Sequence, residues 1–168
     1  MNELPHPDHR YLEAAEGWLG LGNWREAGAE LEQIQPQFRL HPSVLEIRYK
    51  IHAEAKRWPE AVVVAKTVRD LLPDELWGYF YTAYALHELK DTQAAYDTLA
   101  TVVAKYPEDY MIQYNLACYA CQLGRLEEAQ QWLKQAMDLG GQRDLTELAL
   151  EDEDLKPLWA HLRARLKG

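Results

Sequence analysis

The chain has 168 residues, 48% of them hydrophobic, which is enough apolar material for one domain with a buried core and excludes a disordered chain. The net charge of −9 argues against nucleic acids and anionic membranes as partners, because both attract basic proteins. The N-terminus lacks a basic and apolar leader, and no apolar run is long enough to span a membrane. We therefore expect a cytoplasmic protein that binds neither nucleic acid nor membrane.

A 34-residue period runs through most of the chain. Four aligned segments each close on an alanine: Ala27, Ala61, Ala95 and Ala129. Columns four and seven residues after these alanines are apolar throughout. Hydrophobic residues recur at helical spacing on both sides of a break, which falls near one position of the period: Gly22, Lys56, Lys90 or Gly124. The period predicts a helical hairpin repeated four times, in which each hairpin buries its apolar faces against its neighbours.

The period and segments such as Leu123-Gly124-Arg125-Leu126-Glu127-Glu128-Ala129 resemble the tetratricopeptide repeat over residues 8–141. The resemblance implies an all-α fold, a right-handed superhelix (α-solenoid) of four helix-turn-helix units with C-terminal capping helices. The expected domains, in chain order, are an N-terminal extension at 1–7, repeat units at 8–41, 42–75, 76–109 and 110–143, and capping helices at 144–168. Pro36 and Pro42 predict that the second helix of the first unit ends early or bends.

A different apolar pattern follows the repeats. One stripe at helical spacing predicts a terminal helix that covers the last hairpin: Leu155, Leu158, Trp159, Leu162 and Leu166. Asp154 is the expected N-cap of this helix, and Pro157 falls in its first turn. A shorter helix before it is expected to end at the acidic residues 151–153.

The resemblance also implies a concave surface lined by the first helix of each unit. In the family's register, the third and fourth units present aromatic and soft side chains to this groove: Trp77, Phe80, Tyr81, Tyr84, Met111 and Tyr114. The first two units add charged ones: Glu16, Glu46 and Lys50. Aromatic side chains are enriched where proteins bind partners, so we expect the groove to take a peptide with large apolar anchors. The alternative is that a neighbouring hairpin or the capping helix covers these aromatics.

Some members of the family hold the C-terminal carboxylate of heat-shock chaperones with a clamp of Lys, Asn, Asn, Lys and Arg. Counted from the first unit, the clamp positions hold Leu12, Glu16, Ile47, Trp77 and Tyr81. Counted from the second unit, they hold Glu46, Lys50, Tyr81, Met111 and Asn115. The first set has no cation and the second pairs its lysine with a glutamate. Binding of chaperone tails is therefore not expected.

No motif predicts catalysis, a cofactor or a metal ion. Cys118 and Cys121 have CxxC spacing, but a structural zinc site needs four ligands and a thioredoxin-like motif needs a strand before its helix. Both fall in the middle of a predicted helix, so we expect ordinary groove or core cysteines. His87-Glu88 lacks the second histidine of a zinc-protease helix. We expect no enzyme.

These observations favour an adaptor that binds a protein or peptide partner in its groove. The first alternative is a self-associating scaffold, a homo-oligomer in which the first hairpin or the C-terminal helix docks on another copy. A weaker alternative is a small chaperone for secreted substrates, for which the sequence offers no signal beyond the repeat itself.

Overall fold

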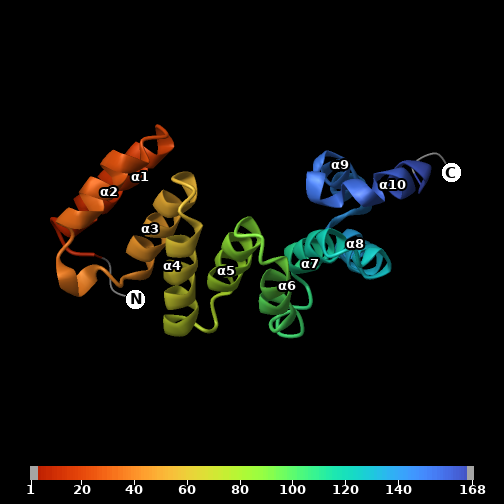
Figure 1. Ribbon diagram of the computed structural model, residues 1–168. Helices are drawn as coiled ribbons and strands as arrows, with labels where there is room; N and C mark the ends of the chain where they lie inside the picture. Colours follow the sequence, from red (N-terminus) through yellow and green to blue (C-terminus); the bar gives the residue numbers. More distant parts are fainter. Residues whose placement is uncertain (1–3, 166–168) are drawn as a thin grey trace. The chain divides into compact units, whose positions relative to one another are not determined.

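The computed structural model describes residues 4–165, and this part of the chain contains helices and no strand (Figure 1). Four first helices begin at residues 8, 42, 76 and 110: α1 (Asp8–Gly20), α3 (Pro42–Glu54), α5 (Leu76–Glu88) and α7 (Tyr110–Gln122). Four second helices begin at residues 24, 58, 92 and 126: α2 (Trp24–Gln33), α4 (Trp58–Leu71), α6 (Thr92–Ala100) and α8 (Leu126–Gly140). Both series keep the 34-residue spacing of the sequence, and the all-α prediction is confirmed.

A tight left-handed turn separates the two helices of each hairpin. Its central residue has a positive φ, of 73° at Gly22, 54° at Lys56, 66° at Lys90 and 75° at Gly124. Glycine adopts this conformation without strain, whereas a side chain meets its own backbone. The break expected at this position of the period is therefore a sharp turn. In the second and third hairpins a lysine has the positive φ that this turn requires.

The alanine column packs at the centre of the hairpins. Ala27, Ala61, Ala95 and Ala129 are all 0% exposed. The apolar columns four and seven residues later are buried as well: Leu31, Ala65, Leu99, Leu133, Ile34, Val68, Val102 and Ala136. Small residues at one column allow the helices to approach, and larger ones at the next fill the space between hairpins. The columns read from the sequence are thus the core of the fold.

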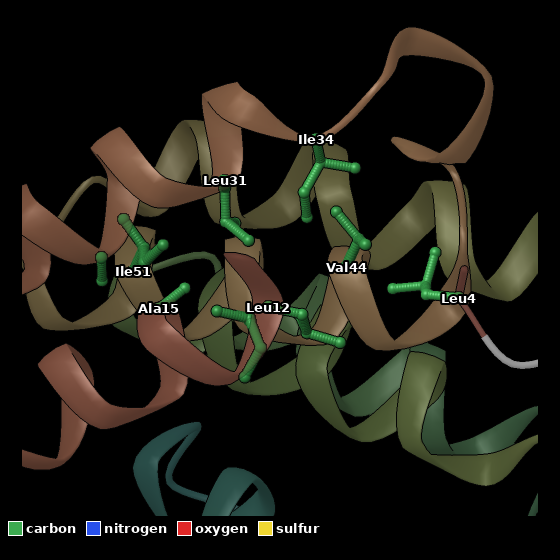
Figure 2. Packing of buried hydrophobic residues seen from close by; sticks show 9 residues of the cluster. Leu4, Leu12, Ala15, Leu31, Ile34, Val44 and Ile51 are labelled. Carbon is green, nitrogen blue, oxygen red and sulfur yellow. The ribbon is translucent and has the colours of Figure 1, made fainter. Parts of the chain in front are cut away.

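The chain divides into two compact units, residues 1–85 (unit 1) and 86–168 (unit 2), each described by itself. In unit 1, α1, α2 and α3 direct side chains into one apolar cluster, shown in Figure 2: Leu12, Ala15, Ala27, Leu31, Ile34, Val44, Ile47 and Ile51. Leu4, which precedes α1, joins this cluster and is 7% exposed. The expected N-terminal extension therefore contributes to the core, which the sequence did not predict.

A buried carboxylate fixes the end of the first hairpin. α2 ends at Gln33, as the prolines predict, and a short 3-10 helix, η1 (Pro36–Phe38), follows. Asp8 is 0% exposed and accepts hydrogen bonds from the Gln35 backbone N–H at 2.7 Å and side-chain Nε2 at 2.8 Å. The start of α1 is thereby tied to the loop that leads to α3.

The helices α4 and α5 approach closely at a glycine. A Cβ atom added at Gly78 would lie 2.9 Å from the backbone N of Arg69. Backbone atoms cannot move away as a flexible side-chain tip can, so this contact requires glycine. The close approach places the aromatic residues of α5 within reach of α3 and α4.

In unit 2, the chain continues after α8 as α9 (Gln142–Glu151), the 3-10 helix η2 (Glu153–Leu158) and α10 (Trp159–Arg165). The predicted stripe faces inward, with Leu155, Leu158 and Leu162 at most 4% exposed; Leu166 lies outside the described residues. The single expected helix is divided because Pro157 has no N–H and obstructs α-helical bonding to the preceding turn. Asp152, not Asp154, caps it and accepts from the Asp154 N–H at 3.0 Å.

Within residues 4–165, none of the helices combines the length and the apolar composition needed to cross a membrane.

Candidate functional site

In unit 1, two helices bring together four of the predicted groove residues: Glu46, Lys50, Trp77 and Tyr81. We call them the α3–α5 cluster. The ring of Tyr81 stacks on that of Tyr49, with centroids 4.1 Å apart and planes 2° from parallel. The ring of Trp77 packs edge-on against that of Tyr81, with centroids 5.2 Å apart. Tyr49 is 4% exposed and forms the floor of the cluster. The buried Tyr49 ring thus supports an aromatic platform.

The charged members of the cluster are paired with one another. Lys50 Nζ lies 2.7 Å from Glu46 Oε1, and this hydrogen bond raises the pKa of Lys50. Glu16 and Tyr81 are close enough to act on Lys50 in the same direction. Burial raises the pKa of Tyr81, and the Glu46 carboxylate, which accepts its hydrogen bond, raises it further. At neutral pH the cluster therefore holds a charged lysine and a neutral phenol.

The cluster remains accessible to a ligand. The side chains of Glu46 and Lys50 are 41% and 47% exposed, and Trp77 and Tyr81 are half-buried. A ligand could place an apolar group against the rings and a polar group against the carboxylates. Aromatic rings supply much contact area at little entropic cost, which suits such a surface for peptide recognition.

The remaining predicted residues of unit 1 lie outside the cluster or at its edge. Glu16 is exposed on α1 and reaches Lys50 only through its charge. Tyr84 is 48% exposed, and its ring meets Trp58, at the start of α4, edge-on at 5.7 Å. Phe80 is half-buried.

In unit 2, the corresponding side of α7 is covered by the chain itself. Met111 is 37% exposed at the start of the helix, but Tyr114 is only 4% exposed. The Tyr114 hydroxyl donates to Asp152 Oδ2 at 2.9 Å, and the Cys118 thiol donates to the same atom at 3.5 Å. The link between α9 and η2 therefore lies over α7, and Tyr114 is reached only if this link moves away.

Two further bonds hold this link in place. The side-chain amide of Gln122 donates to the Asp154 carbonyl at 2.8 Å, and His87 Nε2 lies 3.1 Å from the Asp154 carboxylate. His87 is itself positioned by Thr92, 3.0 Å from its other ring nitrogen. The acidic residues at which the preceding helix was expected to end, together with Asp154, thus also bond to α7. Because no signal in the sequence relates residue 152 to residue 114, sequence reasoning missed these contacts.

The two cysteines have the chemistry of core residues. Burial, with the carboxylates of Asp152 and Asp154, raises the pKa of Cys118 well above its usual range. The same causes raise the pKa of Cys121 to about 11. Since the thiolate is the reactive form, both thiols are poor nucleophiles at neutral pH.

Comparison with known proteins identifies the fold. No protein-family model matches the chain, and neither does any curated protein. Among solved structures, MamA (41-end) from Desulfovibrio magneticus RS-1 aligns with a TM-score of 0.76 at 20% identity, covering 98% of this chain and 96% of that one. MamA of AMB-1 aligns with a TM-score of 0.64 at 15% identity, covering 92% and 96%. Nearly identical TPR-like repeats from Podosopora anserina align at 0.69 and 20% identity, covering 96% of each chain.

The fold is of the tetratricopeptide-repeat type. At these identities the likeness concerns the path of the chain and not the side chains at any site. The all-α solenoid architecture that the sequence predicted is confirmed, whereas the handedness of its superhelix and the exact limits of the four units stay predictions. The groove across the third and fourth tetratricopeptide-type hairpins also stays a prediction.

Proposed function

We propose that this chain is a protein-interaction module that binds a peptide segment at the α3–α5 cluster. Tetratricopeptide-type arrays expose extended surfaces on which protein segments dock, and this supports an interaction module in general. The observation that carries the finer proposal is the accessible Trp77–Tyr81 pair on its buried Tyr49 floor, beside Glu46 and Lys50. Nucleophilic catalysis by Cys118 or Cys121 is not part of the proposal, because burial raises the pKa of both thiols.

The chemistry of the cluster defines the ligand. The rings of Trp77 and Tyr81 offer a surface for one large apolar side chain. Glu46 is already paired with Lys50, and Glu16 adds a second carboxylate nearby, so carboxylates exceed cations at this place. A peptide with an aromatic or long aliphatic anchor flanked by a lysine or arginine matches both features.

The proposal is tested by selecting peptides from an unbiased display library against the intact protein. Affinities are then measured for wild type, Trp77→Ala and, as a matched control, Trp18→Ala, which removes a tryptophan that is 36% exposed on α1. Loss of a central aromatic anchor is expected to weaken binding by about thirtyfold or more, with the control unchanged. Equal binding by both variants would contradict the proposal.

A second variant keeps the test sharp if Trp77→Ala disturbs the fold. Glu46→Gln removes one negative charge from an exposed pair and leaves the rings in place. It is expected to weaken peptides with a basic flank and to leave unchanged the same peptides with the basic residue replaced by glutamine. The self-association alternative is tested by solution mass, since a dimer in which Trp77 is buried would replace the peptide with a second copy.

A further inference from the structure

A pocket of unit 1, separate from the α3–α5 cluster, is lined by more positively than negatively charged side chains, whereas the chain as a whole is negative. It has a volume of about 390 Å³ and lies between α2, α3 and the turn before α4. Its lining includes three arginines and a histidine: Arg25, Arg48, Arg57 and His52. The chain carries a net charge of −9, so a concentration of guanidinium groups in one hollow departs from its average surface.

The arginine nearest the core has unused hydrogen-bond donors. Nη1 of Arg48 lies 3.5 Å from Glu32, but its Nε and Nη2 atoms are buried and have no acceptor within residues 4–165. Nδ1 of His52 is also buried without a partner in that part of the chain. Buried donors that lack an acceptor cost about 1–3 kcal/mol each, so an acceptor at this place would be stabilising.

The carboxylates nearby do not cancel this charge. Glu32 lines the pocket, and its two oxygens lie 3.5 Å from Arg48 and 3.4 Å from Arg39, so its charge is shared between two arginines. Burial is the main cause that lowers the pKa of His52. The charge of Glu60 raises this pKa, and the charges of Arg57 and Arg48 lower it. The histidine is thus a neutral group that a bound anion would help to protonate.

An aromatic ring holds the outer arginines in place. The guanidinium carbons of Arg25 and Arg57 lie 4.3 Å and 4.9 Å from the ring centroid of Trp24. Such contacts restrict the side chains without using their N–H groups, which remain able to bind oxygen atoms in a forked geometry. Planar guanidinium groups arranged around one hollow are suited to a tetrahedral oxyanion.

We propose that the hollow bordered by Trp24, Arg48, His52 and Arg57 is a binding site for a phosphate monoester group. Arg48 and Arg57 donate to its oxygens, and the His52 ring lies beside it. This site shares no residue with the α3–α5 cluster, so the phosphate proposal does not depend on the proposed peptide site. The phosphate group belongs either to a small ester or to a phosphorylated side chain, and both share this chemistry.

The experiment is a titration followed by two-dimensional NMR of the His52 ring and the Trp24 indole N–H in the intact protein. The probes are inorganic phosphate, phenyl phosphate and a short peptide with one phosphoserine, beside its unphosphorylated form. We expect saturable shifts of both signals, with a Kd of about 1 mM or lower for the best probe. A phosphopeptide that binds about tenfold tighter than phenyl phosphate identifies a phosphorylated chain as the source, and the reverse order a small ester.

Arg57→Gln alters an exposed arginine and is expected to weaken binding about tenfold without loss of the fold, and Arg48→Gln is expected to do so more strongly. Arg69→Gln, in the last turn of α4 and outside this hollow, is the matched control and should bind as wild type does. Trp77→Ala should also leave phosphate binding unchanged, which separates this site from the peptide surface. The proposal is overturned if no probe shifts His52, or if Arg57→Gln and Arg69→Gln bind equally.

Discussion

Unit 1 and unit 2 contain the same type of hairpin, but the side chains of their first helices differ in how accessible they are. In unit 1 the polar groups of the α3–α5 cluster bond to one another, and the side chains of Glu46 and Lys50 remain 41% and 47% exposed. In unit 2 Tyr114 and Cys118 bond to Asp152, a residue of the chain's own C-terminal link, and each is 4% exposed. The position of a residue in the repeat therefore predicts which face of a first helix it lies on. Whether that face is accessible depends on the segment that follows the repeats.

The largest effect is expected where the C-terminal segment joins the core. Leu155 in η2 is 0% exposed, so Leu155→Ala leaves a cavity and should lower the free energy of unfolding by about 2–5 kcal/mol. Urea unfolding followed by circular dichroism measures this. Leu148→Ala, at a leucine 44% exposed on α9, is the control and should cost less than about 0.5 kcal/mol. Equal losses would mean that the segment is not part of the folded core.

A smaller loss is expected in unit 1 from removal of its buried carboxylate. Asp8→Ala leaves the Gln35 N–H without its acceptor and should cost about 1–3 kcal/mol. Hydrogen exchange should show the loss in unit 1, while the protection of α7 in unit 2 stays as in wild type. Equal loss of protection in both units would show that they do not unfold as separate compact units.

Alkaline pH should destabilise the protein through the buried cysteines of unit 2. A thiol in an unfolded chain has a pKa of about 8.5, whereas that of Cys121 in the folded protein is about 11. The folded state keeps the proton longer, so its stability is complete below about pH 8.5 and falls as the pH rises toward 11. Melting temperature should fall more between pH 7.5 and 9.5 in wild type than in the Cys118→Ala/Cys121→Ala variant. The same decrease in both proteins would disprove this assignment.

The smallest effect concerns the turns. Lys56 and Lys90 have positive φ, so Lys56→Gly and Lys90→Gly should each raise the free energy of unfolding by about 1 kcal/mol. Lys66→Gly, in the interior of α4, should lower it by a similar amount because glycine is unfavourable within helices. Chemical denaturation measures all three. Destabilisation by all of them would show that the turn backbone differs from that described here.

The fold was predictable because its information is local and repeated. Ala27 and its equivalents recur at one spacing, and each repetition confirms the register of the others. The candidate site was predictable in part, since the family register placed Glu46, Lys50, Trp77 and Tyr81 on first helices. The bond from Tyr114 to Asp152 was not predictable, because it joins a repeat to a segment outside the period.

Three-dimensional contacts specific to one hairpin were missed for the same reason. Asp8 in the first turn of α1 has the pattern of an ordinary helix-start acid, and its bonds to Gln35 depend on a loop that occurs only in the first hairpin. The pocket bordered by Arg48 and His52 gathers residues from two hairpins that no motif connects. Contacts that occur in only one hairpin thus cannot be predicted from the repeat pattern.

The difference between the two units is tested most directly by hydroxyl-radical footprinting of the intact protein with and without a display-selected peptide. Bound peptide is expected to lower the oxidation of Trp77 and Tyr81 in unit 1 and to leave that of Met111 in unit 2 unchanged. Protection of Met111 with unaltered oxidation of Trp77 and Tyr81 would place the ligand on the wrong unit and contradict the account.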